Sequence, residues 1–191
     1  FEAGKSYYMD VILRDTVEMN KFIEYSGSGE IVENLKFGAS DGEYNDFFGD
    51  SIATVEGGPG EGIYALVGAT TYDTGSNINS NEGAAYLFQN KFDTLGWQEK
   101  LKLTASDGQT LDFLGYSVSI ASGTDGIYAL CGAYGEDDKG SNAGAAYIFH
   151  SASAGIITEQ KLTASNGQLG DRLGYSVSIA SGTDGIYALC G

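Results

Sequence analysis

The residues with the clearest potential for chemistry are acidic. Glu136, Asp137 and Asp138 stand in a row within the segment 135–142, and neighbouring carboxylates are the oxygen ligands that divalent cations prefer. The segment 71–83 is a second long polar loop. Loops carried on a rigid scaffold are also where recognition residues concentrate. Two interpretations stay open for this cluster: an adventitious cation site and a solvated loop.

Enzymatic chemistry is not indicated by the remaining reactive residues. The single histidine, His150, has no Ser or Cys nucleophile in a strained turn to form a triad with it. No Cys/His group has the spacing of a zinc site. The glycines do not lead into a helix, so they do not form a phosphate cradle. We therefore expect no catalytic residues and no cofactor.

The two cysteines occupy equivalent positions in two copies of a repeat. Cys131 and Cys190 both follow the residues Ile-Tyr-Ala-Leu, and Val67 stands at this position in an earlier copy. A position that accepts either Val or Cys is typical of a small buried apolar site. Equivalent positions of neighbouring repeats are too far apart for a disulfide. We predict two free, buried thiols.

Composition excludes several classes of partner. The chain has 26 acidic and 10 basic residues, a net charge of −16, which repels nucleic acid and anionic membranes and suits a divalent cation or a basic partner. No apolar run approaches the roughly 18 residues needed to cross a bilayer, so we expect no membrane insertion. The chain begins at Phe1 without a recognisable signal peptide, as expected of a processed or partial product.

A repeat organises most of the chain. Residues 114–132 and 173–191 are the same nineteen residues, and 48–68 is a degenerate third copy. Short runs with strand-like alternation are bounded by Gly, Ser, Asn or Asp, as in all-β proteins. Tyr116, Val118 and Ile120 fall on one face of such a run, with serines on the other. Four antiparallel strands per unit, stacked face to face, predict β-propeller blades.

The predicted units have definite boundaries. The second unit contains an outer strand in 97–106 and three further strands in 116–122, 126–134 and 144–152. We expect blade units at 30–96, 97–155 and 156–191, the last incomplete, all within a region 30–191. Because two and a half units cannot close a ring, we expect either that the chain continues beyond Gly191 or that blades are completed between molecules.

Residues 1–29 lie outside the repeat. Alternation in 7–14 predicts a half-buried strand that pairs with a second strand near 20–25, and Ser26–Gly29 predicts a linker. Residues 1–11 resemble the last strands of a PA14-like β-sandwich. The alternative is a generic terminal β-hairpin.

Three short motifs recur in register in the repeat units. They are a Phe-Gly or Leu-Gly pair, a Gly-Ala pair and a Gly-Ala-Ala-Tyr-x-Phe strand, at Phe48-Gly49, Leu114-Gly115, Leu173-Gly174, Gly68-Ala69, Gly132-Ala133, 83–88 and 144–149. With these motifs the repeat resembles the FG-GAP blades of integrin α subunits. The resemblance implies two full blades and a partial one, and a non-enzymatic extracellular or cell-surface protein. The expected role is adhesion, recognition or assembly through a protein partner or self-assembly. The alternatives are an accessory propeller of a secreted hydrolase and a glycan-binding, lectin-like module.

The resemblance also raises the question of calcium. Many blades of this family hold Ca²⁺ in an Asp-x-Asp-x-Asp-Gly loop, but the corresponding loops here keep one carboxylate each: Glu61, Asp125 and Asp184. One carboxylate cannot supply the six to eight oxygens that Ca²⁺ takes. We therefore expect no metal and keep Ca²⁺ as the alternative, with Asp125, Asp184, Glu136, Asp137 and Asp138 as its candidate ligands.

Two further positions have structural interpretations. An aspartate recurs just before each Phe-Gly or Leu-Gly pair, as Asp46, Asp112 and Asp171, and this predicts an Asx turn or a cap on nearby N–H groups. Trp97 begins an outer strand. We expect it to pack against a neighbouring blade, and the alternative is an exposed platform for sugar.

Overall fold

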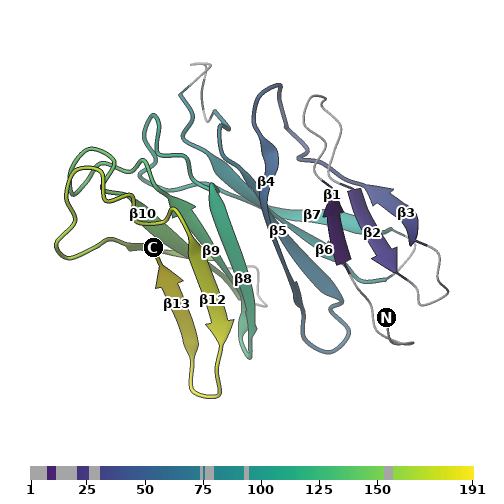
Figure 1. The fold of residues 1–191 in the computed structure, drawn as a ribbon. Helices are drawn as coiled ribbons and strands as arrows, with labels where there is room; N and C mark the ends of the chain where they lie inside the picture. The colour runs from purple at the N-terminus through teal and green to yellow at the C-terminus, as the bar shows by residue number, and fades with distance from the viewer. Residues whose placement is uncertain are drawn as a thin grey trace.

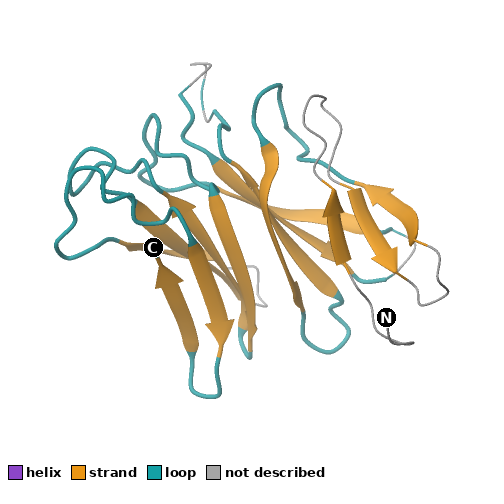
Figure 2. Cartoon of the chain, viewed as in Figure 1, coloured by secondary structure: helices purple, strands orange, loops and turns teal. Residues whose placement is uncertain are grey.

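The computed structural model describes residues 8–11, 21–25, 31–73, 75, 80–92, 95–152 and 157–191. Every regular element in these ranges is a strand, so the predicted all-β class is confirmed (Figure 1, Figure 2). The strands are β1 (Tyr8–Val11), β2 (Lys21–Tyr25), β3 (Ile31–Lys36), β4 (Phe48–Glu56), β5 (Ile63–Ala69), β6 (Ala84–Asn90), β7 (Trp97–Leu103), β8 (Ser117–Gly123), β9 (Gly126–Ala133), β10 (Ala145–Ala152), β11 (Ile157–Leu162), β12 (Val177–Ser181) and β13 (Ile186–Cys190).

These strands form antiparallel sheets in which consecutive strands pair. β4–β5–β6–β7 form blade 1, β8–β9–β10–β11 form blade 2, and β12–β13 form a two-stranded partial blade. A separate three-stranded sheet contains β1, β2 and β3. The predicted two full blades and one partial blade are confirmed. The blades stand side by side without closing into a ring (Figure 1).

The sheets and the sequence units are offset by one strand. β7 and β11, which begin the second and third sequence units, pair with β6 and β10 of the preceding units. Six residues separate β6 from β7 in the sequence, whereas thirteen residues separate β7 from β8, which belongs to the next sheet. A short connection favours antiparallel pairing with the preceding strand, so each outer strand stays with the earlier sheet.

One extra residue in β7 is absorbed by a β-bulge. The register between β6 and β7 shifts beside Phe88, which pairs with Glu99. In blade 2, Phe149 pairs with Glu159 and the register has no shift. A bulge accommodates an inserted residue by local disruption of the ladder. Glu99 and Glu159 are therefore structurally equivalent, although an ungapped alignment of the two units separates them by one position.

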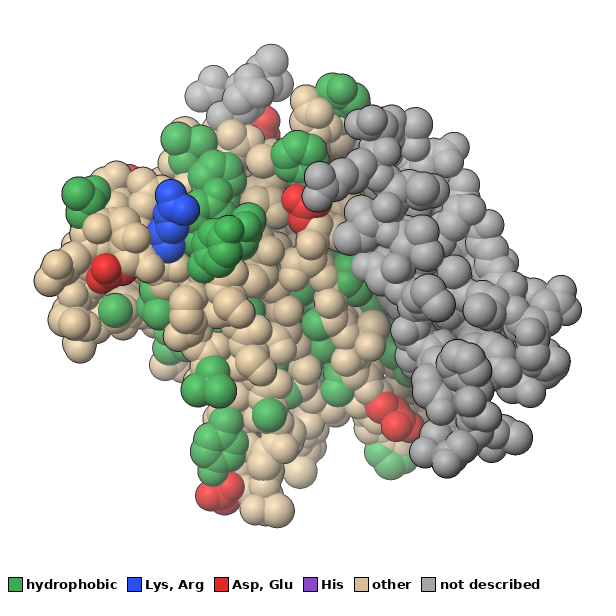
Figure 3. Space-filling view, in the orientation of Figure 1, with side chains coloured by type: hydrophobic (Ala, Val, Ile, Leu, Met, Phe, Trp, Pro, Cys, Tyr) green, Lys and Arg blue, Asp and Glu red, His purple; other side chains and the backbone are tan. Residues whose placement is uncertain are grey.

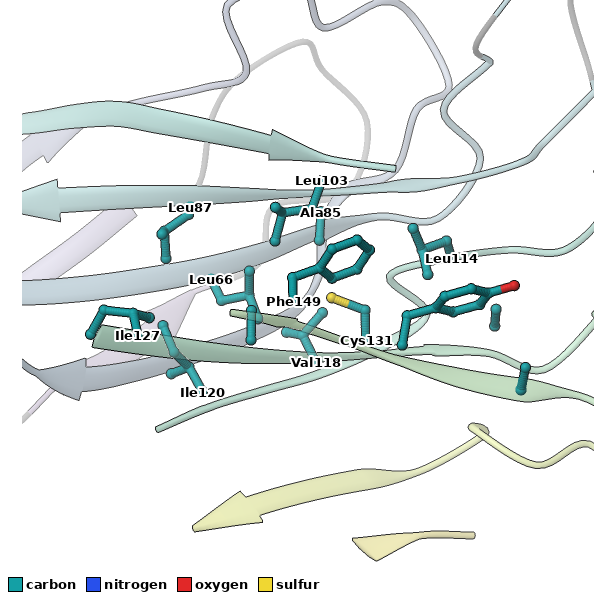
Figure 4. Close-up of a cluster of buried hydrophobic side chains, with 14 residues drawn as sticks. Leu66, Ala85, Leu87, Leu103, Leu114, Val118, Ile120, Ile127, Cys131 and Phe149 are labelled. Atoms are coloured by element: carbon teal, nitrogen blue, oxygen red, sulfur yellow. The ribbon is translucent and has the colours of Figure 1, made fainter. Parts of the chain in front are cut away.

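The main hydrophobic core lies between blades 1 and 2. Val118 and Ile120 are buried there, which confirms the predicted apolar face of β8. Figure 4 shows side chains of the two sheets meeting in this layer: Leu66, Ala85, Leu87 and Leu103 from blade 1, and Val118, Ile120, Ile127, Cys131 and Phe149 from blade 2. A second, smaller cluster around Leu130 and Ile179 joins blade 2 to the partial blade. Both full blades are thus covered on the side that faces the next blade.

Glycines allow this close approach. A Cβ on Gly68 would overlap the carbonyl oxygen of Gly115, and a Cβ on Gly132 would overlap that of Gly174. The Leu-Gly pair that opens one blade therefore rests on the Gly-Ala pair of the preceding blade. Any side chain at these glycines would force the two backbones apart, which gives the recurring Gly motifs a packing reason.

Serines on the polar face of the inner strands hydrogen-bond across the blades. The backbone N–H of Val118 donates to Ser51 Oγ at 2.9 Å, and that of Ile179 donates to Ser119 Oγ at 3.1 Å. Ser117 Oγ donates to the Gly174 carbonyl at 2.7 Å. The serine face of β8 thus tethers it to the inner strand of the next blade, besides being small enough to permit the contact.

The predicted N-terminal pair of strands is confirmed by β1 and β2, which pair antiparallel. β2 also pairs with β3. The predicted linker at 26–29 lies outside the described residues, as do residues 1–7 of the PA14-like stretch. The described part contains no helix of the length and hydropathy that a membrane span requires.

Candidate functional site

The recurring aspartates before the Phe-Gly and Leu-Gly pairs close tight turns. Each carboxylate accepts a hydrogen bond from the backbone N–H three residues earlier: Glu43 to Asp46 at 2.6 Å, Gln109 to Asp112 at 2.7 Å and Gln168 to Asp171 at 2.8 Å. The predicted structural role of these residues is confirmed. Asp112 is only 3% exposed. Burial raises its pKa to about 6, opposed by the Gln109 hydrogen bond and reinforced by the charge of Glu136.

The backbone beside these turns is held in the left-handed region. Leu111 and Phe113 have φ of 71° and 59° on either side of Asp112. This conformation costs roughly 1–2 kcal/mol for a residue other than glycine. The position of Leu111 is filled by Gly170 in the third unit, with φ of 80°, which shows the less strained choice. Strain of this kind concentrates at functional sites.

Lys102 of the outer strand β7 fixes the loop between β3 and β4 onto blade 1. Lys102 Nζ donates to Asp41 Oδ2 and to the Tyr72 hydroxyl, both at 2.7 Å. Tyr86 donates its hydroxyl to Asp41 at 2.8 Å. Burial raises the pKa of Asp41, but the hydrogen bonds and charge of Lys102 and the hydroxyls of Tyr86 and Tyr72 hold it below its usual range. Asp41 therefore remains an ionised acceptor that ties the loop to β6 and β7.

The equivalent lysine of blade 2 binds three carboxylates. Lys161 Nζ lies 2.7 Å from Asp107, 2.8 Å from Glu136 and 2.6 Å from Asp138. Glu136 occupies the position of Tyr72, and its side chain is 2% exposed. Burial lowers the pKa of Lys161, but these carboxylates raise it well above its ordinary value overall. The ammonium thus already supplies the positive charge at the centre of the acidic cluster.

The acidic cluster is therefore only partly the solvated loop that the sequence suggested. Asp137 and Asp138 are exposed, whereas Glu136 is buried because it turns toward Lys161. Asp137 accepts a hydrogen bond from the Asn142 backbone at 2.6 Å, which closes the loop. Among the described residues no group of three or more His, Cys, Asp or Glu side chains has an arrangement that holds a metal ion.

The hairpin loops between the first two strands of each blade do not fit calcium. Asp125 is the one acidic residue of the β8–β9 loop and already accepts the Tyr128 hydroxyl at 3.0 Å. The position of the later acidic ligand is Ala129 in blade 2 and Ala65 in blade 1, and both are buried in hydrophobic clusters. An alanine in the core offers no oxygen in place of the missing carboxylate, so these residues do not form the oxygen cage of a Ca²⁺ site.

The histidine and the cysteines are not arranged for catalysis. His150 stacks face to face on Tyr128 with ring centroids 4.1 Å apart. Cys131 is buried and free as predicted, and burial raises its pKa far above the ordinary thiol value. Cys190 is free but half-buried, so the prediction of a buried thiol is wrong there. Its sheet consists of β12 and β13 alone, whereas Cys131 lies in a four-stranded sheet packed against blade 1.

Trp97 packs on its own blade, so the prediction that it packs against a neighbouring blade is wrong. Its ring stacks on Phe37 with centroids 5.3 Å apart and an interplanar angle of 26°. Both residues contact the hydrophobic cluster on the face of blade 1 away from blade 2. The half-buried indole therefore does not form an open platform for sugar.

Sequence reasoning missed an aromatic cluster at the loop ends of blade 2 and the partial blade. Tyr116 meets Tyr134 at 4.6 Å and Tyr175 at 4.8 Å between ring centroids. Phe113 stacks on Tyr134 at 5.0 Å, and the Arg172 guanidinium lies 5.8 Å from the Tyr134 ring. Tyr175 is 48% exposed. Figure 3 shows hydrophobic side chains gathered over the upper ends of β8 and β12.

The repeat positions of two of these tyrosines partly indicated the cluster from the sequence. Tyr116 and Tyr175 are the same residue of two repeat copies, so neighbouring blades necessarily bring them to the same end. A hydrogen bond with Tyr175 and burial raise the pKa of Tyr116 to about 12. The Tyr116 hydroxyl therefore stays protonated at neutral pH and is available as a donor and an acceptor.

Antiparallel four-stranded sheets that stack face to face define an array of β-propeller blades. The FG-GAP repeat family matches residues 32–88 and 97–149, and the chain belongs to this family. A comparison with curated proteins gave no match. The PA14-like resemblance of the N-terminal residues stays a prediction.

Proposed function

We propose that this chain is a non-enzymatic recognition segment of an extracellular or cell-surface protein and that it binds a protein partner. The observation that carries this proposal is the partly exposed aromatic cluster of Phe113, Tyr116, Tyr134 and Tyr175, with Arg172 beside it. Tyrosine and arginine are enriched in protein interfaces and among the residues that dominate binding energy. The proposed location rests on the family.

Backbone strain beside the cluster supports a role in recognition. Phe113 and Arg172 occupy equivalent positions and have φ of 59° and 58°. Phe47, the equivalent residue of the first unit, has a φ of 51°, so this conformation recurs in all three units. A bulky side chain in this conformation destabilises the fold, which favours a function for the side chains that the turns present. The net charge of −16 favours a partner with a basic surface, because complementary charge accelerates encounter.

The reactive side chains favour a non-catalytic role. Burial holds Cys131 as a thiol, which is a poor nucleophile. Asp112, whose carboxyl has its pKa raised to about 6, is fixed by the Gln109 backbone in a structural turn. His150 is stacked on Tyr128 beside the exposed Asp125 hairpin. Each of these residues has its own structural role, and together they do not form a nucleophile–base pair.

The test compares the wild type with the Tyr116→Ser/Tyr175→Ser variant on a panel of purified extracellular protein domains. Tyr44→Ser is the matched control, because Tyr44 is 80% exposed and belongs to the loop of another blade. The proposal expects a bound domain whose affinity falls at least about tenfold with the double variant and stays unchanged with the control. Binding that survives the double variant would overturn it.

Glycan recognition is the second candidate, because partly exposed tyrosine rings that carry hydroxyl groups also suit sugars. The same three proteins are applied to a glycan array. Glycan binding that depends on Tyr116 and Tyr175, without a protein ligand on the panel, would replace protein recognition by a lectin-like function.

Sedimentation of the wild type and the double variant tests whether the partner is a second copy of this chain. A wild-type oligomer that the double variant abolishes assigns the cluster to contacts between copies.

A further inference from the structure

We infer that a carboxylate–tyrosine pair closes the first hairpin of each blade, at the loop where blades of this family hold calcium. The Tyr64 hydroxyl donates to Glu61 at 2.9 Å, and the Tyr187 hydroxyl donates to Asp184 at 2.7 Å. Tyr128 donates to Asp125, with both carboxylate oxygens 3.0 Å away. The same contact thus recurs in all three blades and has no part in the aromatic cluster.

The spacing of the pair is constant although the loop changes. Each tyrosine stands three residues after its acid in the sequence acid-Gly-Ile-Tyr. The loop of blade 1 is longer, and its acid is Glu in place of Asp. A pair preserved across loops of different length and acid type indicates a contact that the hairpin needs, since an incidental contact would follow the loop geometry.

The glycine of the acid-Gly-Ile-Tyr sequence has no room for a side chain, because the neighbouring strand lies against it. A Cβ on Gly62 would overlap the Asn90 carbonyl oxygen, and a Cβ on Gly126 would overlap that of Ser151. Gly62 also accepts a backbone hydrogen bond from Gly57 at 2.8 Å, which closes the base of the loop. The chain therefore turns sharply against the third strand, and the acid is brought back toward the tyrosine ring.

The third strand supports the tyrosine from its other side. Gln89 Nε2 donates to the Tyr64 hydroxyl at 2.7 Å and to the Glu61 carbonyl at 2.9 Å. His150 occupies the equivalent position in blade 2 and stacks on Tyr128. The rings of Tyr64 and Tyr128 are thus held between the loop acid and a polar residue at the end of the third strand, which fixes the hydroxyl toward the loop.

A protonated phenol is needed for this contact, and the surroundings favour one. Burial and the Glu61 carboxylate raise the pKa of Tyr64 to about 12, with Gln89 opposing. Burial and Asp125 likewise raise the pKa of Tyr128, and Asp184 raises that of Tyr187. The hydroxyl therefore remains the donor and the carboxylate the acceptor at physiological pH. The hairpin is closed by the chain's own atoms and requires no cation.

The test measures thermal unfolding of the full chain with EDTA or with millimolar Ca²⁺, for the wild type and for Tyr128→Phe. Tyr44→Phe is the control, because it removes a hydroxyl from an exposed ring. We expect the wild-type Tm to be the same in EDTA and Ca²⁺. We expect Tyr128→Phe to lower the Tm by about 2–4 °C in both, the effect of one lost hydrogen bond in a chain of this size. The control leaves the Tm unchanged.

Terbium luminescence supplies a second readout, with Tb³⁺ as the probe for oxygen-lined calcium sites. We expect no saturable Tb³⁺ binding that depends on Asp125 or Asp184, so that neither Asp125→Asn nor Asp184→Asn changes the Tb³⁺ signal. A wild-type Tm that rises by several degrees with Ca²⁺ through Asp125 or Asp184 would overturn the inference. So would a Tyr128→Phe variant as stable as the wild type, because the tyrosine would then not close the hairpin.

Discussion

Replacing the lysine that holds three carboxylates is predicted to destabilise the fold far more than replacing its counterpart in the neighbouring blade. Lys161→Met keeps the apolar stem, which packs beside its neighbours, and removes the ammonium that contacts Asp107, Glu136 and Asp138 at 2.6–2.8 Å. Lys102→Met removes an ammonium that pairs with Asp41 alone among carboxylates. The two substitutions are otherwise alike.

The magnitude follows from the burial of the partners. The Glu136 side chain is 2% exposed, and loss of its partner leaves a buried, unpaired charge, which costs about 3–5 kcal/mol. Asp41 is 41% exposed and returns to water, so the loss of its surface pair costs about 1 kcal/mol or less. We expect a difference of at least about 2 kcal/mol between the two variants.

The assay is urea unfolding followed by fluorescence of Trp97, the only tryptophan. The free energy of unfolding is compared for the wild type, each lysine variant and the Lys161→Met/Glu136→Gln double variant. Glutamine keeps the acceptor that the Asp138 backbone uses at 2.9 Å but carries no charge, so the double variant is expected to recover most of the loss. Equal losses in the two lysine variants, or no recovery in the double variant, would refute the reasoning.

Three further outcomes follow from the same structure. Because burial raises the pKa of Asp112 from 3.8 to about 6, the folded chain takes up this proton first as the pH falls. Asp112→Asn should therefore raise the free energy of unfolding at pH 7 by about 2–3 kcal/mol. The wild type should become more stable as the pH falls from 6 to 4, and the variant should lack this gain. Asp171→Asn at the exposed third turn should have little effect, and urea midpoints across this pH range test both variants. Leu111→Gly should stabilise the chain by roughly 1 kcal/mol, because it relieves a φ of 71° at an exposed residue, and a lowered Tm would contradict this. Gly132→Ala should lower the Tm by many degrees, because the added Cβ would overlap the Gly174 carbonyl oxygen of the next blade. Gly58→Ala, where an added Cβ would have nothing within 4 Å, should leave the Tm unchanged. Similar Tm values for the two variants would disprove the close backbone contact between the blades.

Local sequence pattern predicted the strands and the turn aspartates because both depend on short-range geometry. Alternation at Val118 and Ile120 identified the buried face of β8, since side chains alternate across a strand. The recurrence of Asp112 and its equivalents identified the turns, because the carboxylate caps a backbone N–H group only three residues away. The acid-Gly-Ile-Tyr spacing was equally readable, although its hydrogen bond emerged only with the structure.

Contacts between distant segments were not predictable from these patterns. Lys161 lies 54 residues from Asp107 and 25 from Glu136, and periodicity within one strand carries no information about such pairs. The burial of Glu136 follows from that distant lysine, so an acidic run appeared to be a solvated loop. Glu99 and Glu159 hold the Ser40 and Ser106 loops in the same way, but the bulge in β7 hides their equivalence in the sequence.

The aromatic cluster required the arrangement of two blades. Tyr116 and Tyr134 flank two paired strands of blade 2. Tyr175 belongs to the partial blade and reaches them because the two sheets stand side by side. This surface is the basis of the proposed function, so it is where the account is most directly open to test.

The most direct measurement is hydrogen–deuterium exchange of the wild-type chain with and without the partner domain identified on the protein panel. The account predicts slower exchange confined to segments 111–117, 134–136 and 172–176, which carry the aromatic cluster. Protection centred on the hairpin loops around Asp125 and Asp184, or on the outer strands β7 and β11, would contradict it.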